Sequence, residues 1–174
     1  AIADGMGGTD FGEVASQIAV DASVEYLANT DSAKLLNKPA GELGNAVKYA
    51  NEAIIAIQQN QEQYRAMGST LTCFLMVNNQ LHFSWVGDSR IYIVRPAQNS
   101  IQMLTRDHTL DRNKIDATLA PDLYRRAPSI LTQKVGSILL IQPDTDCFDL
   151  QVGDIVLACT DGLTDRIEDR LLLE

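Results

Sequence analysis

The stretch Leu71-Thr72-Cys73-Phe74-Leu75-Met76-Val77-Asn78-Asn79 decides the fold class of this chain. Its first seven residues place apolar side chains on both alternating faces, which is typical of a strand buried between two layers. The asparagine pair then turns the chain back. Further strands are predicted at 80–86, 90–95 and 101–105, with Gly87-Asp88 as the second turn. We therefore predict an antiparallel meander over residues 71–105.

Helical patterns precede this block and more strands follow it. Apolar residues recur at helical spacing over 14–26 and again over 43–57, where Pro39 opens the second helix. Residues 106–137 are less regular and predict a loop with short helical pieces. The remaining expected elements are strands at 138–141, 146–150 and 155–160 and a short helix from Asp165. Helices first and strands afterwards predict an α+β fold with a layered sheet core and helices on its outer faces.

Composition narrows the class of protein and its partners. The 174 residues are 45% hydrophobic, which suits one globular domain. The formal charge of −9 repels nucleic-acid phosphate, so we expect no nucleic-acid partner. The apolar runs are too short for a membrane helix, which needs about 20 residues, so no membrane partner is expected. Three widely spaced cysteines predict no disulfide framework and favour a reducing cytoplasm.

Two predicted strands end in the same dipeptide, Asp4-Gly5 and Asp161-Gly162. Each places a carboxylate where a hydrophobic strand leaves the core, and such carboxylates can converge. Mg²⁺ and Mn²⁺ prefer oxygen ligands, and a glycine beside the ligand lets a backbone carbonyl approach the metal. The alternative is that Asp-Gly is only a common turn dipeptide, and for either pair alone that interpretation is the stronger one.

Two more acidic positions and one histidine are candidates for the same site. Asp107 follows the strand at 101–105, and Asp88 sits in the turn before the strand at 90–95. Asp88 has a simpler interpretation, in which it stabilises its own turn and pairs with Arg90. For His108, beside Asp107, a structural hydrogen bond is favoured over a catalytic role.

Five segments in order resemble motifs of the metal-dependent serine/threonine protein phosphatases of type 2C. Residues 4–8 with 12–16 resemble the first metal loop and the helix after it, in the form with methionine common among bacterial members. The other matching segments are residues 68–70, 86–90, 105–108 and 160–163. Each motif alone is weak, but five in sequence over nearly the whole chain are specific.

This resemblance implies an α-β-β-α sandwich of two antiparallel sheets flanked by helices, with two core Mn²⁺ or Mg²⁺ ions at one end. By analogy, Asp4 bridges both ions, the Gly5 carbonyl completes one and Asp161 holds the other. Asp107, with Asp161, matches a third and weaker site, with Asp88 and His108 as supporting residues. A water activated by the metals, rather than a protein nucleophile, then attacks phosphoserine or phosphothreonine in a phosphoprotein substrate.

The chain departs from the family pattern at both ends. The family places a phosphate-binding arginine and an acidic ligand before the first metal loop, and an Asp-Asn pair near the C-terminus. Neither is present, so we expect residues 1–174 to be a single domain, incomplete at both ends, from a longer protein.

Two other functions are alternatives to the phosphatase hypothesis. The first is a catalytically inactive, phosphatase-like regulatory domain that binds a partner protein. The second is a nucleotide-binding domain, but no Lys and Ser/Thr follow the glycines at 5–8, so it is disfavoured. The sequence predicts no particular oligomeric state.

Overall fold

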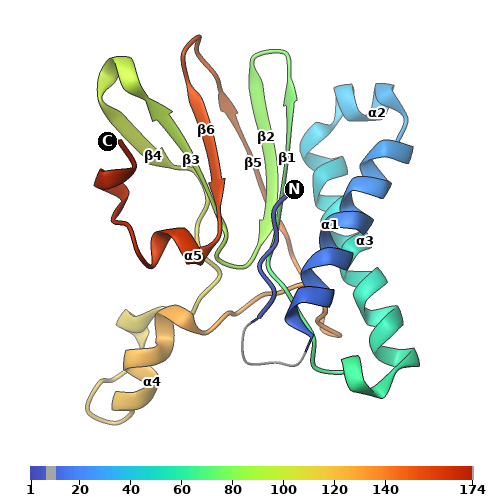
Figure 1. Cartoon of the computed structure of the whole chain (residues 1–174), viewed down its shortest axis with the longest axis vertical. Helices are drawn as coiled ribbons and strands as arrows, with labels where there is room; N and C mark the ends of the chain where they lie inside the picture. Colours follow the sequence, from blue (N-terminus) through green and yellow to red (C-terminus); the bar gives the residue numbers. More distant parts are fainter. Residues whose placement is uncertain (7–10, 174) are drawn as a thin grey trace.

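Two antiparallel three-stranded sheets form the centre of the molecule. The structure is a computed structural model that describes residues 1–6 and 11–173. One sheet has the strand order β1-β2-β5 and the other β4-β3-β6. Figure 1 shows the two sheets side by side between the long helices and the C-terminal segment. The strands are β1 Leu71–Val77, β2 Gln80–Val86, β3 Arg90–Arg95, β4 Ser100–Met103, β5 Asp144–Asp149 and β6 Ile155–Cys159.

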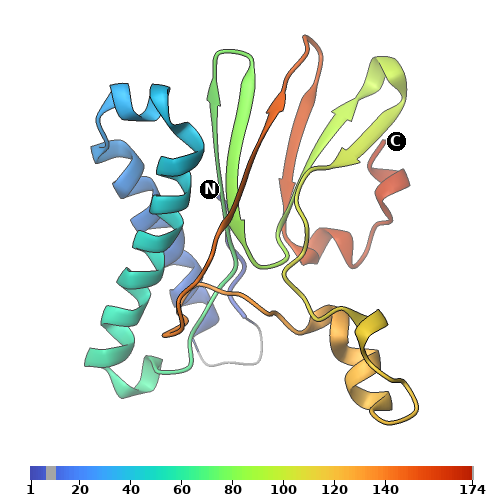
Figure 2. The ribbon, with the colours of Figure 1, turned by 180° about the vertical axis from the view of Figure 1, so that it is seen from behind.

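A helical layer covers the outer face of the β1-β2-β5 sheet (Figure 2). Its long members are α1 Gly12–Asn29 and α3 Pro39–Asn60, joined through the short α2 Ser32–Asn37. Alanines on α1 let the two helices approach closely, and Val47 and Ile54 of α3 pack with Leu71 of β1 in a fully buried cluster. Pro39 opens α3, as the sequence predicts. Helix α2 was not predicted.

A second core lies between the two sheets. Leu81, Phe83 and Trp85 alternate along β2 and pack with Ile91 and Ile93 of β3. Burying each of these large side chains contributes about 1.5–3 kcal/mol. The predicted layered sheet core is therefore confirmed, with apolar side chains filling the space between the layers.

The predicted single meander is wrong at Gly87-Asp88. β2 pairs with β1 and β5, whereas β3 pairs with β4 and β6, so the chain crosses from one sheet to the other at residues 87–89. A turn between two apolar strands looks the same in sequence whether the strands pair or face each other across a core. The crossover, rather than a hairpin, therefore carries Asp88.

The predicted strand at 138–141 does not form. The preceding Gly136 and Ser137 amides donate to Asn51 Oδ1 on α3 rather than to a strand (2.8 and 3.0 Å), and Ile138, Leu139 and Leu140 are exposed. The helix expected from Asp165 does not form, because the short helix α5 Asp161–Thr164 ends just before that residue.

The remaining segments lie at the ends and on the far side of the sandwich. The 3-10 helix η5 Asp169–Leu173 packs against β4, so the α-β-β-α prediction is confirmed with a short outer layer on that side. The irregular segment 106–137 carries η3 Arg112–Lys114, α4 Pro121–Arg126 and η4 Ala127–Ser129 and projects beyond one end of the sheets (Figure 1). None of the helices described is both long and apolar enough to cross a membrane.

Candidate metal centre

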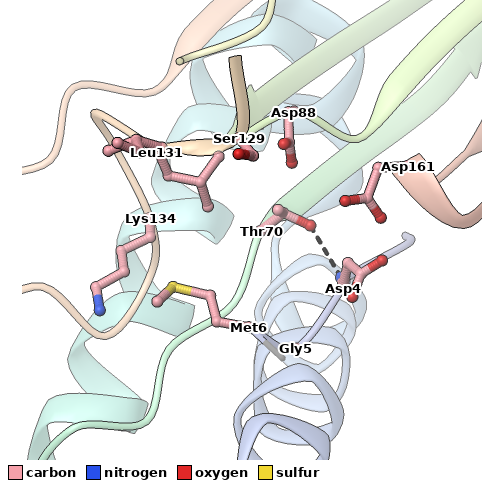
Figure 3. A pocket seen from close by; sticks show the side chains of 10 residues that line it. Asp4, Gly5, Met6, Thr70, Asp88, Ser129, Leu131, Lys134 and Asp161 are labelled. Carbon is pink, nitrogen blue, oxygen red and sulfur yellow. Dashed lines mark hydrogen bonds between the residues drawn. The ribbon is translucent and has the colours of Figure 1, made fainter. Parts of the chain in front are cut away.

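Three carboxylates from separate elements meet at one end of the two sheets. Asp4 follows the short bridge between Ile2 and Thr72, Asp88 lies in the crossover, and Asp161 is the first residue of α5. All three line one cavity of about 470 Å³. Figure 3 shows their side chains facing a common space beside Thr70.

The backbone of Asp4 is held on both sides by the segment that opens β1. Its amide donates to Thr70 Oγ1 (2.9 Å), and its carbonyl accepts from the Thr70 amide (2.9 Å) and from Ser69 Oγ (2.8 Å). Thr70 Oγ1 also shares a hydrogen bond with Ser89 Oγ beside Asp88 (2.7 Å). Thr70 therefore couples two of the three carboxylate loops, a role that the sequence interpretation missed although it singled out residues 68–70.

His108 fixes the crossover that presents Asp88. The His108 amide donates to the Gly87 carbonyl (2.9 Å), and the Gly87 amide donates to His108 Nδ1 (3.2 Å). The imidazole stacks on Trp85 with ring centroids 6.0 Å apart, and Nε2 lies 3.3 Å from an Asp144 carboxylate oxygen. These contacts are those of a structural histidine, the role favoured from the sequence.

The negative charges of the carboxylates repel one another. Burial, followed by the charges of Asp161, Asp107 and Asp4, raises the pKa of Asp88 to about 6. Asp161 is the most exposed of the three, yet partial desolvation and then a hydrogen bond with Asp4 raise its pKa as well. A divalent cation among these groups would relieve the repulsion.

Asp107 is engaged elsewhere. Arg90 donates to it from Nε to Oδ1 (2.9 Å) and from Nη2 to Oδ2 (2.6 Å), a bidentate ion pair. The predicted pairing of Asp88 with Arg90 is therefore wrong, because the crossover turns Asp88 toward the cavity and leaves Arg90 to Asp107. A third-site ligand role for Asp107 stays a prediction.

The donor set suits a hard cation. Within residues 1–6 and 11–173, no three His, Cys, Asp or Glu side chains form a complete cluster that could hold a metal ion. Mg²⁺, however, is usually held by one or two carboxylates with retained waters, which the converging Asp4 and Asp161 can supply. Gly5 lines the same cavity, and a Cβ there would collide with the Gly12 carbonyl where α1 begins. The oxygen donors thus fit Mg²⁺ or Mn²⁺.

The opposite wall of the cavity comes from the irregular segment. Ser129, Ile130, Leu131 and Lys134 line it, together with Met6 from the N-terminal loop (Figure 3). No local pattern marked the wall residues of 129–134 as functional, because only the return of this segment to the sheets brings them to the site.

The family pattern described as Protein phosphatase 2C matches residues 1–173. The chain belongs to the protein phosphatase 2C family. The serine/threonine protein phosphatase PstP of Mycobacterium tuberculosis is 33% identical over 180 residues, which cover 100% of this chain and 33% of that protein. The protein phosphatase PhpP of Streptococcus pneumoniae is 34% identical over 170 residues, 95% of this chain and 67% of that protein.

A solved structure with a similar fold contains manganese, one of the metals expected from the sequence. It is the catalytic domain of PstP in complex with two manganese ions, 30% identical, with a TM-score of 0.75 over 98% of this chain and 70% of that chain. The chain spans about one third of the length of the whole PstP protein.

Proposed function

We propose that this protein is a metal-dependent phosphatase that hydrolyses phosphoserine or phosphothreonine in phosphoproteins. The observation that carries the proposal is the convergence of Asp4, Asp88 and Asp161 on one cavity at the sheet ends. Membership of the protein phosphatase 2C family and the two manganese ions of the PstP catalytic domain support it.

The residues that line the cavity have different roles in the proposed reaction. Asp4, Asp161 and the Gly5 carbonyl would hold two Mn²⁺ or Mg²⁺ ions, and Asp88 would accept hydrogen bonds from waters in the cavity. The bound ions supply the charge that acidifies a water and neutralises the phosphoryl oxygens. Thr70 is hydrogen-bonded to both the Asp4 loop and the loop that carries Asp88. The two carboxylates are therefore positioned before substrate arrives.

A water is the attacking group in this proposal. No cysteine lines the cavity: Cys73 and Cys159 are buried and Cys147 is exposed on β5. The Thr70 hydroxyl is occupied by hydrogen bonds with the Asp4 amide and Ser89.

We also propose a cytoplasmic location, which the three free, widely spaced cysteines support.

The second candidate is a phosphatase-like regulatory domain without catalysis. It is favoured by the incomplete ligand set that Asp4 and Asp161 form within the described part of the chain. Metal stoichiometry separates the two functions. Two tightly bound ions per chain support the enzyme, and no bound ion supports the regulatory domain.

The test is hydrolysis of p-nitrophenyl phosphate and of a phosphothreonine peptide by the intact protein. We expect turnover with Mn²⁺ or Mg²⁺ and its loss in excess chelator, because the site offers carboxylate oxygen and no soft ligands. Full activity in chelator would overturn the proposal.

A further inference from the structure

A second cavity adjoins the candidate active site. It has a volume of about 1060 Å³ and lies between the C-terminal end of α3 and residues 134–139. Lys134 lines both cavities, so the two adjoin at this side chain. We call the second cavity the α3 groove, and its lining includes Gln58, Glu62, Arg65, Lys134, Ile138 and Leu139.

The floor of the α3 groove is rigidly built. Val135 exchanges two backbone hydrogen bonds with Ser69, at 2.9 and 3.2 Å, next to the residue that holds Asp4. On the other side, the buried Gln58 amide donates to the carbonyls of Met67 (2.8 Å) and Gly136 (3.0 Å). The wall that separates the groove from the active-site cavity is therefore fixed to both α3 and β1, and a ligand meets a preformed surface.

The groove carries positive charge on an otherwise acidic protein. Arg65 and Lys134 line it against the single carboxylate of Glu62, whereas the whole chain has a formal charge of −9. Neither cation forms an ion pair with a carboxylate in the described part of the chain. Figure 3 shows the Lys134 ammonium directed away from the three aspartates. These cations are thus available to an anionic ligand in the groove.

The rim of the groove is unusually apolar for an exposed loop. Ile138 and Leu139 are 83% and 75% exposed and contribute to neither hydrophobic core. Consecutive exposed apolar residues beside a cavity are typical of a surface that meets a partner. An extended peptide rises about 3.3 Å per residue, so a few residues suffice to pass from one cavity into the other.

We propose that the α3 groove binds the substrate polypeptide that flanks the phosphorylated residue, and that it prefers acidic and apolar residues in that flank. The acidic residue would meet Arg65 and Lys134, and the apolar residue would pack on Ile138 and Leu139. This inference rests on the proposed phosphatase function, because the phosphorylated residue of the same peptide occupies the carboxylate cavity.

The test uses two phosphothreonine peptides that differ only in their flanks, Glu and Leu on both sides in one and Lys and Ser in the other. We expect the intact protein with Mn²⁺ to show about fivefold higher kcat/KM for the acidic peptide, the effect of about one or two exposed charge pairs. Arg65→Glu should remove or reverse this preference. Lys48→Glu, an equal charge change at an exposed site on α3, is the matched control and should keep it.

Apolar recognition is tested in the same assay. Leu139→Asn should lower kcat/KM for the acidic, Leu-containing peptide about threefold, since burial of apolar surface favours binding and Leu139 would be covered only in part. Leu36→Asn, at a 63% exposed site on α2, is the control that should change nothing.

A binding measurement separates this inference from the proposed function. Fluorescence anisotropy with non-hydrolysable phosphonate versions of the two peptides reports the same preference without turnover. Equal Kd values for the two peptides, or a preference that Arg65→Glu leaves unchanged, would overturn the groove proposal alone. A charge-dependent Kd without Mn²⁺-dependent turnover would overturn the phosphatase proposal and keep the groove as a phosphopeptide site.

Discussion

Asp4 is fixed through its backbone, which leaves its carboxylate free to face the cavity. Ser69 and Thr70 satisfy its amide and carbonyl, and within residues 1–6 and 11–173 no Lys, Arg or His forms an ion pair with its carboxylate. A carboxylate placed in this way gains most from a bound cation and suffers most from repulsion when the cation is removed. A substitution at Asp4 therefore distinguishes a metal ligand from a residue that only forms a turn.

Replacing Asp4 with Asn should abolish metal-dependent turnover and leave the metal-free fold as stable as before or slightly more stable. The Asn side chain still suits the turn, but it lacks the negative charge that repels the carboxylates of Asp161 and Asp88. Turnover and thermal melting, each with and without Mn²⁺, are the measurements. Retained activity, or a Mn²⁺-induced rise in Tm equal to that of the unmodified protein, would contradict the bridging role.

Asp161→Ala should cost more activity than Asp107→Ala. Asp161 lines the cavity with Asp4, whereas Asp107 is held by Arg90 outside it. Loss of a residue that acts around a metal site lowers activity about 10- to 100-fold, so Asp107→Ala should fall within that range and Asp161→Ala beyond it. Kinetics at saturating Mn²⁺ compare the two. Equal and complete loss would mean that Asp107 is as essential as the core ligands.

Among the elements, the crossover between β2 and β3 connects the fold to the site. Gly87 has φ of 105°, a conformation that other residues rarely adopt, and an added Cβ would lie 2.6 Å from Thr70 Cγ2. The same turn presents Asp88 and is held by His108. Its backbone conformation and its packing against Thr70 are therefore both needed at the site.

Gly87→Ala should destabilise the protein by about 1–3 kcal/mol through backbone strain, with a further loss from the contact with Thr70. Gly153→Ala is a matched control, because φ there is 93° but nothing lies within 4 Å of the added Cβ. Urea midpoints of the two variants measure the difference. Equal destabilisation would show that contact with Thr70 does not matter.

Elements whose signal is local could be predicted from the sequence, and those set by distant contacts could not. The helical spacing of α1 and α3 and the apolar strand β1 were predicted correctly. The sheet to which β3 belongs was predicted wrongly, because a turn that joins two paired strands and a turn that crosses between two sheets have the same sequence pattern. The loop at 138–141 was mistaken for a strand because an apolar run usually indicates burial, whereas Ile138, Leu139 and Leu140 are exposed here and only Ile141 of this run is buried.

The candidate site divides in the same way. Asp4 and Asp161 could be proposed because each ends a predicted strand, and the structure brings both to one cavity. Lys134 and the partner of Arg90 could not, since residues far apart in the sequence meet only after the irregular segment folds back onto the sheets. A single-domain organisation over 1–174 stays a prediction.

At the scale of the whole molecule, one side chain joins the helical layer to the wall of the site. Asn51 on α3 accepts from the Gly136 and Ser137 amides at 2.8 and 3.0 Å, and its own amide donates to the Ser137 carbonyl at 3.3 Å. The neighbouring Val135 is bonded to Ser69, which holds Asp4. A short path of hydrogen bonds, with one peptide link between Gly136 and Val135, therefore runs from the outer helix to the backbone carbonyl of Asp4.

Asn51→Ala should lower the free energy of unfolding by about 1–3 kcal/mol, because the buried Gly136 amide loses its acceptor. It should also lower kcat/KM, since residues 134–137 would no longer be fixed between α3 and β1. Asn60→Ala, which removes only a local bond to the Ala56 carbonyl near the end of α3, is the control and should change neither quantity by much. Urea unfolding and kinetics with a phosphothreonine peptide test both. Lost stability with unchanged kcat/KM would show that Asn51 supports the fold without positioning the site.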